Sequence, residues 1–143
     1  MTRLIFSGFN MDLLLDTHAV VWYITEDSRL PMFLRRQIED STNNCYVSIA
    51  SLWELGIKHA IGKLALHEEL SVVLEAIEQS GIKSLPIGTD HILSASRLPL
   101  HHNDPFDRMI ISQCQAGQLI MVSCDKQFQH YDIPLVWNRS HNC

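Results

Sequence analysis

Hydrophobic positions along the chain fall into two alternating kinds of pattern. Short, continuous apolar runs rich in Leu, Ile and Val are bounded by polar turns, which predicts strands. The runs do not alternate apolar with polar residues, so both faces of each strand should be buried, as in a parallel sheet. The expected strands are 11–16, 45–48, 83–87, 119–123 and 135–137.

Between these runs, apolar residues recur at helical spacing, and helix-ending signals follow them. Pro31 lies in the first turn of one predicted helix, and Gly62, Gly81 and Gly117 end three others. Alternating strands and helices predict an α/β fold with a mainly parallel sheet of four to five strands covered on both faces. The expected helices are 18–25, 32–40, 48 or 51 to 61, 67–80, 89–97 and 105–116.

Length and composition indicate an ordinary globular protein. The chain has 143 residues, 46% hydrophobic and 19% charged. We expect a single domain over 11–138, a leader or upstream start over 1–10 and a tail over 139–143. Neither a membrane-length apolar run nor a signal peptide is present, so a cytoplasmic location is expected. The four cysteines form no C-x-x-C pair and are expected to be free thiols.

Four acids stand where neighbouring elements of such a sheet would converge. Asp16 ends the Leu13–Leu15 run, and Asp125 follows the 119–123 strand. Glu54 lies just inside the helix after the second strand, and Asp107 lies in the first turn of the 105–116 helix. Parallel strands end at the same edge of a sheet, so the carboxylates should meet there. Mg²⁺ or Mn²⁺ would relieve their repulsion, bind phosphate oxygens and activate water, which points to phosphodiester hydrolysis.

Each acid also has a purely structural interpretation. Glu54 could close a capping box with Ser51, since the two have the S-x-x-E spacing. Asp107 could stabilise a helix N-terminus, and Asp125 could be a turn residue or helix cap. Asp16 is harder to explain in this way, because a charge after three leucines is costly without a partner.

The motifs that carry these acids resemble those of PIN domains, most closely the VapC-type toxins of bacterial toxin–antitoxin pairs. The similar segments are LLLDTH (13–18), VSIASLWELGIK (47–58), HHNDPFDRMIISQ (101–113) and VSCDKQF (122–128). The resemblance implies a three-layer α/β/α sandwich and Mg²⁺- or Mn²⁺-dependent endonucleolytic cleavage of RNA. The matching site positions are Asp16, Glu54, Asp107 and Asp125.

Two further residues of these motifs have supporting roles in this interpretation. Ser123 stands where the family commonly carries Thr or Ser, and would bond a neighbouring carboxylate or the water. Asp104 is either a fifth site acid or the residue that opens the turn before Pro105, and we favour the turn.

The net charge of −5 is unusual for a protein that binds nucleic acid through its backbone phosphates. The resemblance suggests a reason, because an acidic groove would accept a basic inhibitory segment of an antitoxin. RNA binding would then depend on metal ions and on Lys58, Lys63 and Arg108. The family also suggests a homodimer, to which the apolar stretches 20–24 and 30–34 could contribute.

The main competing hypothesis is a catalytically silent PIN-like module that acts by binding a protein partner. An aspartyl phosphatase is disfavoured, because such enzymes place a second acid two residues after the first, where this chain has His18. Zinc binding by His101 and His102 is disfavoured for want of a second ligand pair, and both are expected to be exposed loop residues. Trp22, Trp53 and Trp137 are expected in the core rather than as base-stacking platforms.

Overall fold

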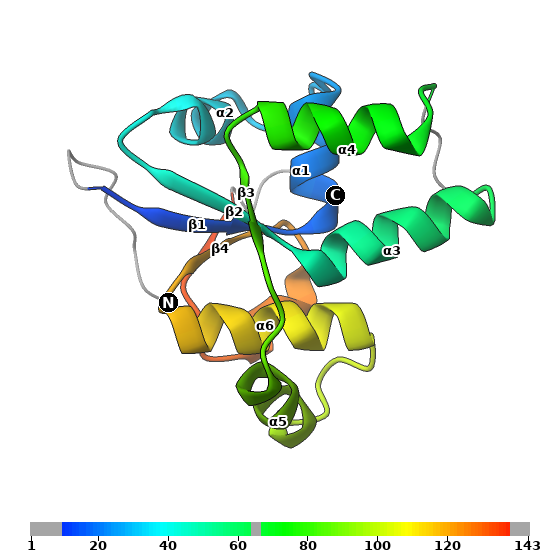
Figure 1. Ribbon diagram of the computed structural model, residues 1–143. Helices are drawn as coiled ribbons and strands as arrows, with labels where there is room; N and C mark the ends of the chain where they lie inside the picture. The colour runs from blue at the N-terminus through cyan, green and yellow to red at the C-terminus, as the bar shows by residue number, and fades with distance from the viewer. Residues whose placement is uncertain (1–9, 64–66, 138–143) are drawn as a thin grey trace.

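The structure is a computed structural model in which residues 10–63 and 67–137 are described (Figure 1). The predicted leader and tail fall almost entirely outside these residues. The strands are β1 (Asp12–Leu15), β2 (Asn44–Ser48), β3 (Lys83–Leu85), β4 (Ile120–Val122) and β5 (Leu135–Val136). The helices are α1 (Thr17–Ile24), α2 (Met32–Glu39), α3 (Ile49–Ala60), α4 (Leu70–Gln79), α5 (Thr89–Arg97), α6 (Pro105–Gly117) and the 3₁₀ helix η1 (Lys126–His130).

The five strands form one fully parallel sheet in the order β3-β2-β1-β4-β5. The chain therefore runs outward from β1 through β2 to β3, and then returns to the other side of β1 to form β4 and β5. The order reverses between β1 and β4. In open α/β sheets the functional crevice lies beyond the carboxyl ends of the strands at this reversal point.

Two apolar cores separate the molecule into three layers. Leu13 and Leu15 face one core with residues of α1, α2, α3 and α4, whereas Leu14 faces the other with residues of α6. Figure 1 shows α1, α2 and α4 above the sheet and α5 and α6 below it. The predicted parallel α/β sandwich is confirmed, and burial of both strand faces explains why the runs lack alternation.

One expectation about a cysteine is wrong, and one about a dimer surface stays a prediction. Val20, Leu30 and Leu34 are buried in the core, whereas Met32 and Phe33 are 60% and 38% exposed, so the second stretch still presents apolar side chains at the surface. Cys45 and Cys114 are buried free thiols, as expected, but Cys124 is disulfide-bonded. No described helix is long and apolar enough to cross a membrane.

Candidate metal centre

The predicted acids gather where the strand order reverses. Asp16 directly follows β1, and its backbone N–H bonds the carbonyl of Val122, the last residue of β4, at 3.2 Å. Ser123 and Asp125 follow β4, so both strands deliver their polar ends to the same edge of the sheet. The middle of α3 and the first turn of α6 bring Glu54 and Asp107 to this edge. We call Asp16, Glu54, Asp107 and Asp125 the acid cluster.

Asp16 is held firmly in a buried position. Its side chain is the N-cap of α1 and accepts a hydrogen bond from the Ala19 N–H at 2.8 Å. Burial raises the pKa of its carboxyl group, and the nearby Asp125 raises it further, whereas hydrogen bonds from Ser123 and Ala19 oppose the rise. Asp16 is only 6% exposed, so a partner for its charge has to come from within the site.

Asp107 also has a strongly perturbed carboxyl group. Burial raises its pKa to about 8, and the nearby carboxylates of Asp104, Glu54, Asp16 and Asp125 add to the shift. All four acids, and Asp104 as well, therefore lie within electrostatic range of one point. Among the described residues, however, the group of three possible metal ligands within 4.8 Å of one another is His102, Asp107 and Asp125, so a metal site shared with Asp16 and Glu54 stays a prediction.

Asp104 has the turn role that the sequence favoured. It is the N-cap of α6, and its Oδ1 accepts hydrogen bonds from the backbone N–H groups of Phe106 at 2.9 Å and Asp107 at 3.3 Å. Pro105 occupies the first turn, where its missing N–H costs nothing. The cap fixes the start of α6 and thereby the position of Asp107.

His102 was expected to be an exposed loop residue, and this is wrong. It is 9% exposed, and its Nε2 lies 2.8 Å from Oδ2 of Asp107 and 3.7 Å from Oδ2 of Asp125. Its Nδ1 accepts a hydrogen bond from the Asp104 N–H at 3.2 Å, so Nε2 of the imidazole carries a proton. His102 therefore places an N–H next to two cluster carboxylates. His101, its neighbour, is exposed as expected.

Ser123 links the two aspartates that follow the strands. Its hydroxyl hydrogen bonds the Asp16 carboxylate, and its oxygen accepts the Asp125 N–H at 3.1 Å. Asp125 in turn caps η1 by accepting the Gln127 N–H at 2.9 Å. The predicted bond from Ser123 to a neighbouring carboxylate is present.

Glu54 lies in a small network of its own. The Thr17 hydroxyl donates to Oε1 at 2.6 Å, and the ammonium group of Lys58 lies 3.0 Å from Oε2. Glu54 is 6% exposed and belongs to the middle of α3, whose N-cap is Ser48, so the capping box with Ser51 is absent. The sequence analysis did not identify Thr17 as a site residue, although the residue directly follows Asp16.

The donor set fits a divalent cation. One ligand-type atom each from His102, Asp107 and Asp125 lie within 4.8 Å of one another. Within the described parts of the chain, the buried Nε2 atom of His102 has no aligned hydrogen-bond acceptor. Because Nε2 carries a proton, the carboxylate oxygens rather than the imidazole suit Mg²⁺ or Mn²⁺, which prefer oxygen ligands.

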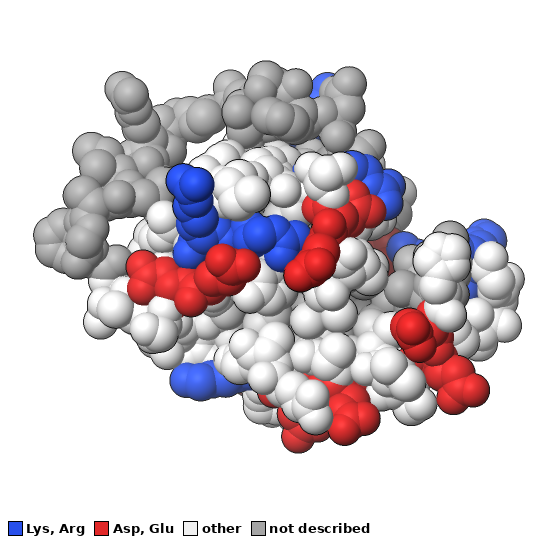
Figure 2. Space-filling model, turned by 90° about the horizontal axis from the view of Figure 1, so that it is seen from above, with Lys and Arg blue, Asp and Glu red and all other residues white. Residues whose placement is uncertain are grey.

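Two of the three cationic side chains that were expected to bind RNA already interact with other groups of the protein. Lys58 pairs with Glu54, and Arg108 donates hydrogen bonds to four backbone carbonyls near the start of α6. Lys63 is exposed beyond the end of α3. On the face shown in Figure 2, Lys and Arg side chains lie beside Asp and Glu and form no broad basic patch among the described residues.

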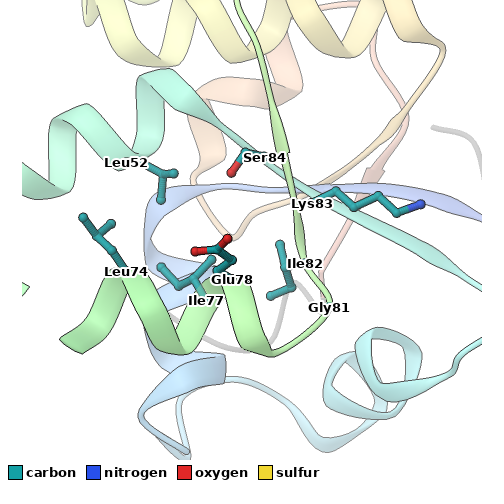
Figure 3. Close-up of a pocket in the computed structure, with 8 residues that line it drawn as sticks. All are labelled: Leu52, Leu74, Ile77, Glu78, Gly81, Ile82, Lys83 and Ser84. Carbon is teal, nitrogen blue, oxygen red and sulfur yellow. The ribbon is translucent and has the colours of Figure 1, made fainter. Parts of the chain in front are cut away.

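A separate cavity of about 630 Å³ lies between α3, α4 and β3 (Figure 3). Its lining is mostly apolar, with Leu52, Leu74, Ile77 and Ile82, and includes Glu78 and Lys83. No residue of the acid cluster lines it, so this cavity is distinct from the candidate metal centre.

Comparisons with known proteins agree with this fold. Residues 13–134 match the family model of the PIN domain. The VapBC2 complex of Rickettsia felis bound to a promoter DNA fragment contains a similar chain, with TM-score 0.66, 18% identity and coverage of 88% of this chain and 98% of that one. FitAcB of Neisseria gonorrhoeae matches with TM-score 0.62 and 20% identity, and the match covers 91% of this chain and 99% of that one. VapBC-1 of nontypeable Haemophilus influenzae matches with TM-score 0.63 and 18% identity, and the match covers 88% of this chain and 97% of that one. No curated protein matches the sequence.

Proposed function

Because the chain belongs to the PIN domain family, we propose that it is a Mg²⁺- or Mn²⁺-dependent endoribonuclease and the toxin of a toxin–antitoxin pair. The observation that carries the proposal is the environment of Asp107. Burial raises the pKa of its carboxyl group to about 8, and the four neighbouring acids Asp104, Glu54, Asp16 and Asp125 add to the rise. Such an arrangement is unfavourable in the isolated fold, and a divalent cation would offset it.

Asp16, Asp107 and Asp125 would hold the cation. Bound there, it would supply positive charge to the scissile phosphate and activate a water for attack. Ser123 keeps the Asp16 carboxylate oriented, and the His102 N–H stands beside Asp107 and Asp125.

Glu54 has the position of a proton acceptor within the cluster. The Thr17 hydroxyl and the Lys58 ammonium fix its two oxygens, so its carboxylate would hold the attacking water or take its proton. In-line attack would leave a 5′-phosphate and a 3′-hydroxyl.

A silent binding module is the competing proposal, and the caps give it some support. Asp16, Asp104 and Asp125 each accept a hydrogen bond at a helix start, which is sufficient reason for an aspartate there. Asp107 accepts no such bond among the described residues and is nevertheless buried beside the other acids. Capping therefore accounts for three of the acids but not for the cluster.

The partners in this proposal are RNA and an antitoxin. Similar chains occur in VapBC and FitAB assemblies and in a toxin–antitoxin complex from Klebsiella pneumoniae. An antitoxin segment with Arg or Lys would pair with the cluster carboxylates and exclude the metal. A homodimer is part of the same proposal, and an RNA substrate would place the protein in the cytoplasm.

Mapping RNA ends in cells tests the proposal. Expression of the wild-type chain should produce new RNA ends carrying a 5′-phosphate, because metal-activated water leaves the phosphate on that side. Asp16→Asn retains the α1 cap oxygen but removes a charge that holds the metal, so it should produce none. Identical new ends from both proteins, or none from the wild type produced in folded form, would count against an endoribonuclease.

A further inference from the structure

Trp53 is an exposed aromatic residue at the border of the acid cluster. Its side chain is 65% exposed, although tryptophan usually buries most of its surface, and the expected core position is therefore wrong for this residue. Trp22 is 5% exposed and belongs to the core, as expected. Trp53 directly precedes Glu54 on α3, so the indole extends to the surface one residue away from a cluster carboxylate.

A second aromatic ring connects Trp53 to the other side of the cluster. The rings of Trp53 and Phe106 meet edge to face, with centroids 5.4 Å apart and planes at 83°. Phe106 lies between Asp104 and Asp107, and its N–H is fixed by the Asp104 cap. The edge-to-face contact anchors the indole beside the start of α6 and leaves at least one indole face uncovered by Phe106.

We propose that Trp53 is a stacking platform for an unpaired base of the RNA next to the cleaved bond, which makes single-stranded RNA the substrate. The inference rests on the proposed function. Every base has a π-face, so stacking on an aromatic side chain binds single strands without requiring a particular sequence. A base inside a duplex is already stacked on both faces and is not available to the indole.

The charges of the protein favour such a platform. The net charge is −5, and Lys58 and Arg108 are already engaged with Glu54 and with backbone carbonyls, which leaves Lys126, the exposed residue after Asp125, as a cation beside the cluster. Phosphate contacts, which usually dominate binding to nucleic acids, are therefore weak here. Stacking provides affinity that does not depend on protein cations.

A protein partner is the competing occupant of this surface. Ile49, Trp53, Ile57 and Ile61 recur every four residues along α3 and are each 38–65% exposed, as a helix-binding stripe would be. Such a partner would use the whole stripe. Base stacking uses Trp53 alone, because the indole is the flat ring and the one in contact with Phe106.

Binding measurements on four variants separate these two occupants. All four proteins carry Asp16→Asn, which prevents cleavage: one has no other change, and the others carry W53A, W53F or I61A in addition. The binding of a single-stranded oligoribonucleotide to each protein is measured by titration in the presence of Mg²⁺. We expect W53A to raise Kd by roughly ten- to a hundredfold, and W53F to retain most of the affinity because it keeps a π-face. I61A is the matched control two turns farther along the stripe and should bind normally. Tryptophan fluorescence should fall on binding in the parent protein but not in W53F.

Two kinds of result would overturn the inference. Unchanged RNA affinity in a folded W53A protein would exclude stacking, and so would tighter binding of the same sequence as a duplex. An equal loss of RNA affinity in W53A and I61A, or a change of oligomeric mass in both variants, would assign the stripe to a protein partner.

Cleavage by the Asp16-containing protein is measured separately. If the wild type cuts RNA and W53A changes neither KM nor kcat, the stacking inference fails and the proposed function stands. If the wild type cuts no RNA, the proposed function itself fails.

Discussion

At the scale of single residues, the site depends on how each carboxylate is compensated. Glu54 has Lys58 and Thr17, and Asp16 has Ser123 and the Ala19 N–H. Asp107 has the His102 imidazole at 2.8 Å but remains the carboxyl group whose pKa is raised to about 8. In the absence of a cation, burial and the neighbouring carboxylates therefore oppose the ionisation of Asp107.

This predicts a pH-dependent stability in the absence of divalent cations. The Asp107 pKa is about 8 in the folded protein and 3.8 for an unperturbed aspartate, so unfolding releases a proton between these values. The free energy of unfolding should then fall as pH rises from about 4 to 8. In urea unfolding with chelator at pH 5 and pH 8, the fall should be larger in the wild type than in Asp107→Asn by at least about 1 kcal/mol. Parallel pH profiles for the two proteins would show that Asp107 ionises normally.

The Thr17 hydroxyl provides a second test at this scale. Thr17→Val keeps the shape of the side chain but leaves Oε1 of the buried Glu54 without its donor at 2.6 Å. We expect a stability loss of about 1–3 kcal/mol by urea unfolding, together with reduced RNA cleavage. Thr17→Ser, which retains the hydroxyl, should keep most of the stability and most of the RNA cleavage activity. Full activity in Thr17→Val would mean that the bond does not orient Glu54 for the reaction.

The sequence predicted the four acids but not their immediate partners. Asp16 and Asp125 were identifiable because they follow apolar runs that predict adjacent parallel strands. Thr17 and Glu54 are 37 residues apart, and His102 and Asp125 also lie far apart in the sequence. Local periodicity carries no information about such contacts. The position of Thr17 directly after Asp16 was the one signal available for it.

At the scale of elements, the side chains of Arg108 and Tyr131 hold the segment between α5 and α6. The Tyr131 hydroxyl donates to the Pro99 carbonyl at 2.8 Å and accepts the His102 N–H at 2.9 Å. Arg108 donates to the carbonyls of Ala95 at 2.8 Å, Leu98 and Pro99 at 3.0 Å, and His102 at 3.2 Å. This guanidinium replaces the hydrogen bonds that an irregular segment cannot make with itself. It thereby fixes the segment that carries His102 and Asp104.

Arg108→Ala should loosen this segment more than it changes the rest of the fold. We expect faster amide hydrogen exchange over residues 98–104, and weaker cleavage because His102 and the Asp104 cap lose their fixed positions. Arg108→Lys should restore little, since one ammonium group cannot reach four carbonyls. If exchange over 98–104 is unchanged in Arg108→Ala, the segment is held by other contacts.

The elements themselves were largely predictable, and the exceptions have physical reasons. The expected strands were found, most of them with shortened ends, such as β3 at Lys83–Leu85 instead of 83–87, whereas β2 begins one residue earlier than expected, at Asn44. η1 was not predicted, because a five-residue 3₁₀ turn has too few residues to establish a hydrophobic period. Trp53 was misplaced because helical spacing places it in an apolar stripe, and spacing alone does not reveal which stripe faces solvent.

At the scale of the whole molecule, strand order explains why distant acids meet. The order in which the chain adds strands to the sheet reverses between β1 and β4, so the residues after these two parallel strands share one crevice. α3 and α6 contribute Glu54 and Asp107 from opposite sides of the sheet (Figure 1). The order of the strands could not be obtained from the pattern of apolar runs, which indicates burial but not neighbours.

Cleavage of an RNA by the purified protein across a Mn²⁺ titration tests the central claim most directly. Activity should be absent in excess chelator, rise with Mn²⁺ and saturate, and Asp107→Asn should lose most of it because one cluster ligand is gone. Activity that remains in Asp107→Asn prepared in the same way would measure contaminating ribonuclease, whereas Thr17→Ser should retain most of the wild-type activity and shows that a substitution in the site does not by itself abolish cleavage. Cleavage that persists in chelator, or an undiminished Mn²⁺ response in Asp107→Asn, would contradict a metal centre at the acid cluster.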